Sequence, residues 1–146
     1  MTQLKLAGVY PLPVWDIQVS ANLQNLPGAP ILASYTATNA EIASSLGRNL
    51  AACGAAAICN ATVSIPLVSP YTLREDRLTQ LDLRLTKGIR VGHTHISGNF
   101  DVYNALNAST VLGSIATYSA GAVNPFMRPT SIVGARLFKF GAQVDF

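Results

Sequence analysis

The sequence predicts an all-β protein, an antiparallel meander of about five long amphipathic strands with two long loops. First, five segments alternate apolar and polar residues with a period of two, as strands do when their faces meet different surroundings. Second, short and long connections alternate between these segments. Third, 49% of the residues are hydrophobic and only 12% are charged, against roughly 25% charged in ordinary soluble domains. With 146 residues, one domain is the natural expectation.

The first two strands are joined by a tight, proline-rich turn at residues 11–14. In the first strand one face holds Leu4, Leu6, Gly8 and Tyr10, and the other holds Gln3 and Lys5. The second strand alternates without interruption, with Trp15, Ile17, Val19, Ala21 and Leu23 on one face and Asp16, Gln18, Ser20, Asn22 and Gln24 on the other. Both segments therefore predict strands with one apolar and one polar face.

The third and fourth strands are joined by a short connection near residues 87–92. The third has Leu81, Leu83 and Leu85 opposed to Gln80, Asp82, Arg84 and Thr86, and the fourth has Ile96, Gly98, Phe100 and Val102 opposed to His95, Ser97, Asn99 and Asp101. The fifth strand has Phe138, Phe140, Ala142, Val144 and Phe146 opposed to Lys139, Gly141, Gln143 and Asp145.

Two long loops, residues 26–77 and 104–130, separate these strands. In the first loop Thr38 and Glu41 have the spacing of a capping box, which predicts a short helix to Leu46 with Gly47 as its stop. The segment 62–68 predicts a further short strand, confined to a sheet edge by its proline.

Cys53 and Cys59 lie in this first loop. Five intervening residues do not match a zinc site, and no Cys or His partner is near in sequence. We expect a local disulfide, which implies an oxidising compartment. Two free buried thiols are the alternative.

The alternation alone fits either a soluble sandwich, whose apolar face is the core, or a membrane barrel, whose apolar face meets lipid. The polar faces here are rich in uncharged side chains, and Tyr10, Trp15 and Phe146 lie near strand ends on the short-turn side, as in an interfacial aromatic girdle. Short turns on one side and long loops on the other are also typical of outer-membrane barrels. We therefore expect an open segment of a transmembrane β-barrel.

The expected lipid-facing residues are Trp15, Ile17, Val19, Leu81, Leu83, Leu85, Ile96 and Phe100. The expected lumen-facing residues are Asp16, Gln18, Ser20, Asn22, Gln80, Asp82, Arg84, His95, Ser97, Asn99, Asp101, Lys139, Gln143 and Asp145.

The last strand carries the most specific pattern. It ends at a phenylalanine and has an apolar or aromatic residue at every second position before it, namely Phe138, Phe140, Ala142, Val144 and Phe146. This pattern resembles the signal that the barrel-assembly machinery reads, and such a strand can be received by strand addition.

Three stretches, residues 74–92, 100–112 and 128–146, together with residues 10–31, resemble the C-terminal end of a TonB-dependent outer-membrane receptor of the Oar-like group. The resemblance implies a barrel of roughly 22 strands around an N-terminal plug, which takes up a scarce solute with energy passed through TonB. Five strands cannot close, because small barrels need about eight. Residues 1–146 are therefore expected to be a fragment that lacks the plug, with Met1 an internal methionine. The other strands are expected to pair with the edges at Thr2–Tyr10 and Ala135–Phe146.

The resemblance also implies an orientation and a set of partners. The C-terminus is expected in the periplasm, and the long loops, with the two cysteines, outside the cell at the ligand entrance. The expected partners are outer-membrane lipid, the rest of the same receptor, the barrel-assembly machinery and, through the missing N-terminal part, TonB. No cofactor is expected.

Other functions receive less support from the residues. The basic side chains are scattered among acidic ones, which argues against nucleic acid. His93 and His95 are expected to share a strand face, but no carboxylate or Cys is close in sequence, so we interpret them as polar lining and not as a metal site. No nucleophile elbow or phosphate loop is present, and an enzyme is not expected. A secreted β-sandwich that binds carbohydrate or protein is the main alternative, and a complete small barrel is a weaker one.

Overall fold

The computed structural model describes residues 2–56, 58–119, 123 and 125–146. It contains two compact units, which we describe separately. The first unit comprises the described parts of Met1–Gly28, Asp76–Val111 and Ile132–Phe146, and the second comprises those of Ala29–Glu75 and Leu112–Ser131. The predicted all-β class is confirmed, with one α-helix among the described residues.

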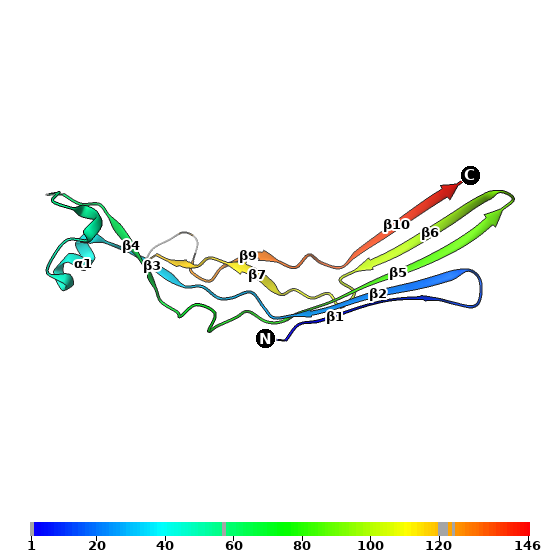
Figure 1. Ribbon diagram of the computed structural model, residues 1–146, viewed down its shortest axis with the longest axis horizontal. Coiled ribbons are helices and arrows are strands. Elements are labelled where there is room, and N and C mark those ends of the chain that lie inside the picture. The colour runs from blue at the N-terminus through cyan, green and yellow to red at the C-terminus, as the bar shows by residue number, and fades with distance from the viewer. Residues whose placement is uncertain (1, 57, 120–122, 124) are drawn as a thin grey trace. The chain divides into compact units, whose positions relative to one another are not determined.

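The first unit is a five-stranded antiparallel sheet (Figure 1). Its strands are β1 (Leu4–Pro11), β2 (Ile17–Leu26), β5 (Leu78–Val91), β6 (Thr94–Tyr103) and β10 (Leu137–Asp145). Their order is β1-β2-β5-β6-β10, so strands that follow one another within this unit are neighbours, as the predicted meander requires. β1 and β10 form the two edges, and the sheet does not close on itself within the described residues.

The register keeps the two faces separate across the whole sheet. Tyr10, Val19, Leu85, Phe100 and Phe140 are successive cross-strand partners and therefore share one face. The residues next to these in each strand form the neighbouring row, on the opposite face. They are Val9, Ser20, Arg84, Asp101 and Lys139. Lys87 interrupts the apolar face, in a row with Ile17, Gly98 and Ala142.

The turn between β1 and β2 differs from the prediction. Strand β2 begins at Ile17 because Trp15 (φ 63°) and Asp16 (φ 52°) have left-handed backbones that break the alternation. The turn is closed by a hydrogen bond from the Leu12 amide to the Ile17 carbonyl, 2.7 Å long. Trp15 and Asp16 therefore lie in the turn and outside strand β2.

The second turn also lies later than expected. Strand β5 continues to Val91, and the hairpin turns at Gly92 and His93, where Gly92 has a φ of 62° that suits glycine. Because His93 lies in the turn, the expectation that it shares a strand face with His95 is wrong. Both tight turns and the C-terminal end of β10 lie at the same end of the sheet (Figure 1).

The remaining elements lie wholly or mostly in the second unit. A small sheet has the order β4-β3-β8, with β3 (Ser34–Thr38) between β4 (Thr62–Pro66) and β8 (Thr117–Tyr118). As predicted, β4 is an edge strand that ends at its proline. A pair of strands, β7 (Val111–Ser114) and β9 (Pro129–Ile132), forms a second ribbon.

The predicted helix is confirmed as α1 (Asn39–Leu46). The Thr38 hydroxyl accepts from the Glu41 amide at 3.4 Å, and the Glu41 carboxylate accepts from the Thr38 amide at 2.7 Å, which completes the capping box. Gly47 ends the helix with a left-handed backbone. A single 3₁₀ turn, η1 (Ala51–Cys53), follows. Within the described residues, no helix is long and apolar enough to cross a membrane.

Candidate functional site

The apolar face of the five-stranded sheet is open. In the described part of this unit, no second sheet or helix packs against it. Phe140 is 78% exposed and Tyr10 65% exposed. Phe100 lies beside two edge-strand rings, with ring centroids 6.1 Å from Phe138 and 4.9 Å from Phe140. These rings form a continuous aromatic surface at the β6–β10 edge.

The most buried residue of β6 lies on its polar face. Asp101, on the polar face, is 3% exposed, whereas Ile96, on the apolar face, is 37% exposed. His95, Ser97 and Asn99, which share the polar face with Asp101, are all half-buried. Phe100 and Val102, on the apolar face, are half-buried as well, so the contrast lies between Asp101 and Ile96 and does not extend to the two faces as a whole.

An ion pair between neighbouring strands accounts for the burial of Asp101. Arg84 Nε donates to Asp101 Oδ1, and Arg84 Nη2 donates to Asp101 Oδ2 at 3.2 Å, so the guanidinium binds the carboxylate with two parallel hydrogen bonds. Lys139 is the cross-strand partner of Asp101 on the other side. The register of β5 against β6 places Arg84 directly opposite Asp101.

Asn104 organises the end of this face opposite the tight turns. It is 3% exposed and has a left-handed backbone (φ 50°). Its side chain donates to the Ala108 carbonyl at 2.9 Å and to the Gly134 carbonyl at 2.8 Å, and it accepts from the Ala108 amide at 2.8 Å. Its own amide donates to Asp82 Oδ1 at 2.8 Å. Sequence reasoning missed this residue, although asparagine is among the non-glycine residues that are enriched at left-handed backbone positions.

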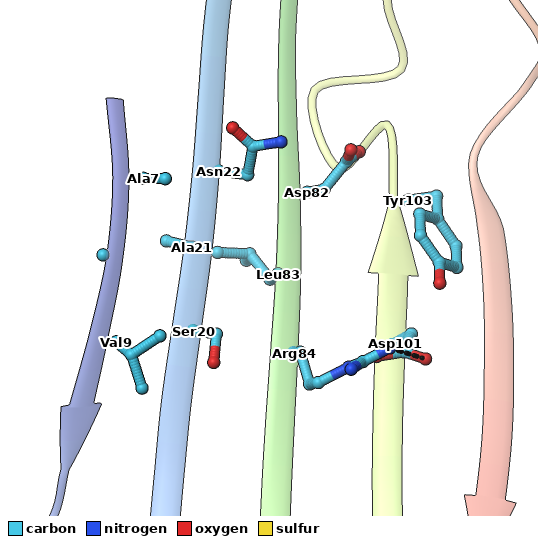
Figure 2. Close-up of a pocket in the computed structure, with 11 residues that line it drawn as sticks. Ala7, Val9, Ser20, Ala21, Asn22, Asp82, Leu83, Arg84, Asp101 and Tyr103 are labelled. Carbon is cyan, nitrogen blue, oxygen red and sulfur yellow. Dashed lines mark hydrogen bonds and ion pairs between the residues drawn. The ribbon is translucent and has the colours of Figure 1, made fainter. Parts of the chain in front are cut away.

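A shallow hollow of about 400 Å³ lies on the polar face beside the ion pair (Figure 2). It exists because β1 and β2 contribute small side chains there, among them Ala7 and Ser20. Arg84, Asn22 and Asp82 supply polar groups at its border (Figure 2). The hollow can accept a polar group of another molecule or segment. Among the described residues, no cluster of three His, Cys, Asp or Glu side chains could hold a metal ion.

The remaining polar-face residues form rows toward the tight turns. Thr86 Oγ1 donates to Asn99 Oδ1 at 2.7 Å, and Gln143 Nε2 donates to Asp145 Oδ1 at 3.0 Å. His95 Nδ1 lies 3.9 Å from Asp145 Oδ2. The structure thus brings the expected lumen-facing residues of β2, β5, β6 and β10 onto one face, namely Gln18, Ser20, Asn22, Gln80, Asp82, Arg84, His95, Ser97, Asn99, Asp101, Lys139, Gln143 and Asp145.

Asp16 lies in the turn, and its side chain covers Gly88 of β5. A Cβ at Gly88 would lie 2.6 Å from Asp16 Oδ2 and 3.0 Å from His95 Nε2. The Gly88 amide also donates to the Asp16 carbonyl at 3.0 Å. This contact between turn and strand holds the left-handed turn in place and leaves Trp15 78% exposed.

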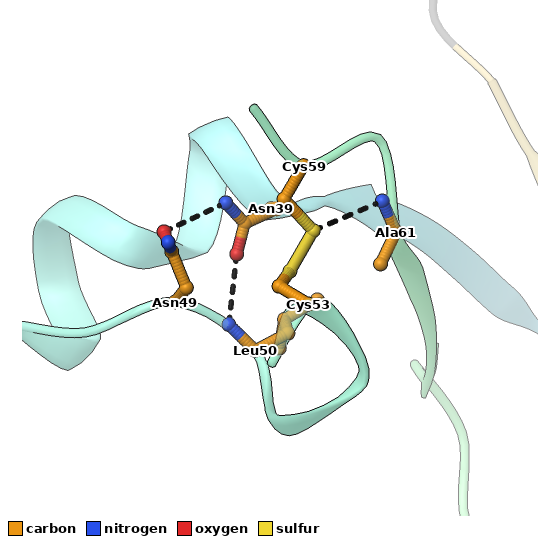
Figure 3. The surroundings of a disulfide bond; sticks show 6 residues. All are labelled: Asn39, Asn49, Leu50, Cys53, Cys59 and Ala61. Atoms are coloured by element: carbon orange, nitrogen blue, oxygen red, sulfur yellow. Dashed lines mark hydrogen bonds between the residues drawn. A yellow bond between two sulfur atoms is a disulfide. The ribbon is translucent and has the colours of Figure 1, made fainter. Parts of the chain in front are cut away.

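The second unit is fixed by a disulfide. Cys53 and Cys59 are bonded, with Cα atoms 5.5 Å apart, which confirms the expected bond (Figure 3). Beside it, Asn39 accepts from the Leu50 amide at 2.8 Å and donates to Asn49 Oδ1 at 3.0 Å. Asn39 thus ties the start of α1 to the segment that follows the helix, and the disulfide closes the loop between Cys53 and Cys59.

Tyr35 and Glu41 form the second polar contact of this unit. The Tyr35 hydroxyl donates to Glu41 Oε1. This hydrogen bond, followed by those from Thr38, holds the pKa of Glu41 below its ordinary value. The same bond raises the pKa of Tyr35 above its ordinary value.

Comparison of the chain with protein-family models, with curated proteins and with solved structures finds no match.

Proposed function

We propose that the five-stranded sheet is a segment of a transmembrane β-barrel, and that the chain is a C-terminal part of a TonB-dependent receptor that takes up a scarce solute across the outer membrane. The observation that carries the proposal is the uncovered apolar face of the sheet, on which Phe140 is exposed, opposite a polar face on which Arg84 and Asp101 form an ion pair. Lipid would solvate the apolar face, and the ion-paired face would line the lumen.

A soluble β-sandwich, the alternative, packs a second sheet about 10 Å from the first over the apolar face. The described part of the first unit contains no such layer. An exposed aromatic and aliphatic surface of this kind is an aggregation liability in water and a suitable surface in acyl chains. This contrast favours the membrane.

The long connections support the receptor assignment. The second unit includes the disulfide, which persists in oxidising surroundings outside the cytoplasm. In the proposed orientation this unit faces the exterior and contributes to the solute entrance, while the tight turns, Trp15 and Phe146 face the periplasm. β1 and β10 then accept the neighbouring strands of the barrel, and the aromatic pattern that ends at Phe146 serves barrel assembly.

The proposal is tested by refolding the chain from urea into buffer and into phosphatidylcholine vesicles. Trp15 is the only tryptophan, so emission reports one position at the turn. We expect aggregation in buffer, and in vesicles co-flotation with lipid, a blue-shifted emission and quenching by acyl chains that carry bromine. A folded monomer in plain buffer contradicts the proposal.

Two neighbouring residues of β5 provide a matched pair of variants. Leu85→Glu places a charge on the apolar face, and Thr86→Glu places the same charge on the polar face. A charge on the lipid face near the bilayer midplane costs about 2–4 kcal/mol for Arg or Lys and less for Glu. We expect Leu85→Glu to reduce the vesicle-bound fraction strongly and Thr86→Glu to leave it nearly unchanged. Equal effects would contradict the assignment of the two faces.

A further inference from the structure

The second unit contains a small pocket with mostly apolar walls and a volume of about 290 Å³. One wall is formed by Ala29, Pro30 and Leu32, and the facing wall by the segment from Leu112 to Ala116. Backbone hydrogen bonds fix the walls, from the Glu75 amide to the Ala29 carbonyl at 2.9 Å and from the Ser34 amide to the Ala116 carbonyl at 2.8 Å. The pocket is therefore part of the folded framework of this unit.

Among the residues that the structure describes, Glu75 is the one charged residue that lines this pocket. It is half-buried, and no cation among the described residues forms a salt bridge with its carboxylate. Its side chain also makes no hydrogen bond to another described residue, since only its backbone amide is engaged. A partly desolvated carboxylate with no internal partner favours a cation from outside, because the attraction is stronger where water is reduced.

We propose that this pocket binds a small apolar molecule that carries one protonated amine. Ligand pockets are typically lined by apolar groups with a few polar groups that fix orientation. Here Leu32 and Leu112, each about half exposed, cover the apolar part of the ligand, and Glu75 accepts from its ammonium group. The volume, just below the usual range of roughly 300–1,000 Å³, suits one ring with a short amine tail.

This inference goes beyond the proposed function, because every residue it uses belongs to the second unit and none needs to lie in a membrane. Failure of the vesicle experiment would leave it standing, and failure of the binding experiment would leave the membrane assignment standing.

The test measures dissociation constants of three probes for the full chain, in whichever medium keeps it folded. The probes are 2-phenylethylamine, its neutral counterpart 2-phenylethanol, and the anion 3-phenylpropionate. Binding of each probe is measured by calorimetry and by shifts in its proton NMR spectrum. We expect the amine to bind at least about tenfold more tightly than the alcohol, since a hydrogen bond to a charged group adds roughly a factor of ten or more. The acid is expected to bind least.

Two neighbouring carboxylates provide the control. Glu75→Gln removes the charge in the pocket, and Asp76→Asn removes an exposed charge one residue along the chain that does not line it. We expect Glu75→Gln to abolish the preference for the amine while binding of the alcohol persists, and Asp76→Asn to preserve the preference. Glu75→Asp, which keeps the charge, is expected to retain a reduced preference. No binding of the amine, equal binding of amine and alcohol, or equal losses in Glu75→Gln and Asp76→Asn would each overturn the proposal.

Discussion

Replacement of Asn104 by alanine is expected to destabilise the first unit by about 4 kcal/mol. The substitution removes the three side-chain hydrogen bonds that join the end of β6 to the Ala108 and Gly134 backbones. It also places a Cβ-bearing residue without a polar side chain at a left-handed backbone position with a φ of 50°.

The magnitude follows from these two losses. Each hydrogen bond contributes about 1 kcal/mol net, so three contribute about 3 kcal/mol, and Asn104 is too buried for water to replace them fully. The left-handed backbone adds about 1 kcal/mol for alanine. Asn104→Gly loses only the hydrogen bonds, because glycine adopts this backbone freely, and is expected to cost about 3 kcal/mol.

Denaturant unfolding of the refolded chain, followed by emission of Trp15 in the same unit, measures both values. Asn107→Ala is the matched control, because Asn107 also has a left-handed backbone (φ 54°) but its side chain accepts a single hydrogen bond, from the Arg136 amide at 3.2 Å. We expect a loss of about 2 kcal/mol there. A loss below about 1 kcal/mol for Asn104→Ala, or no difference between the alanine and glycine variants, would refute the reasoning.

Three further predictions follow from local contacts. Gly88→Ala is expected to lower the free energy of unfolding by about 1–2 kcal/mol, because the added Cβ displaces the Asp16 carboxylate. In a double-mutant cycle, Asp16→Ala in the same chain should suppress much of that loss. Hydrogen bonding lowers the pKa of folded Glu41 below its ordinary value of 4.5, so ionised Glu41 stabilises the fold above that value, and this stabilisation is lost as pH falls through the folded pKa. Thermal unfolding at pH 6 and pH 3 should show the loss. Glu41→Gln should remove this part of the acid dependence. Reduction of the Cys53–Cys59 bond should lower the stability of the second unit by about 2 kcal/mol, and an unchanged protease resistance of this unit after reduction would argue against that role.

Sequence alone was sufficient for features that depend on local chemistry. The five long strands follow from period-two alternation, and α1 follows from the spacing of Thr38, Glu41 and Gly47. The disulfide between Cys53 and Cys59 follows from their short separation. In each case, the residues that determine the feature lie within a few positions of one another.

Features that depend on distant contacts could not be predicted in this way. The start of β2 was placed two residues early, because the left-handed turn is held by a hydrogen bond from Gly88 on β5. The parallel pairing of β3 with β8 joins segments far apart in the chain and leaves no periodic signal in so short a strand. The partner of Arg84 depends on the register of β5 against β6, and a shift by one residue changes every cross-strand pair.

The register of the five-stranded sheet also constrains how the sequence can change during evolution. Leu26 is the cross-strand partner of Leu78, and Tyr103 is the cross-strand partner of Leu137. Each of the two long connections therefore leaves and rejoins the five-stranded sheet at adjacent strand ends. Lengthening such a connection destabilises the fold little, since each doubling of its length adds only about 0.6 kcal/mol to the free energy of loop closure. Insertions, deletions and wholesale exchange of these connections therefore leave every ladder hydrogen bond of the five-stranded sheet intact. Homologous chains are expected to diverge most between these paired residues, while the strands keep their length and alignment.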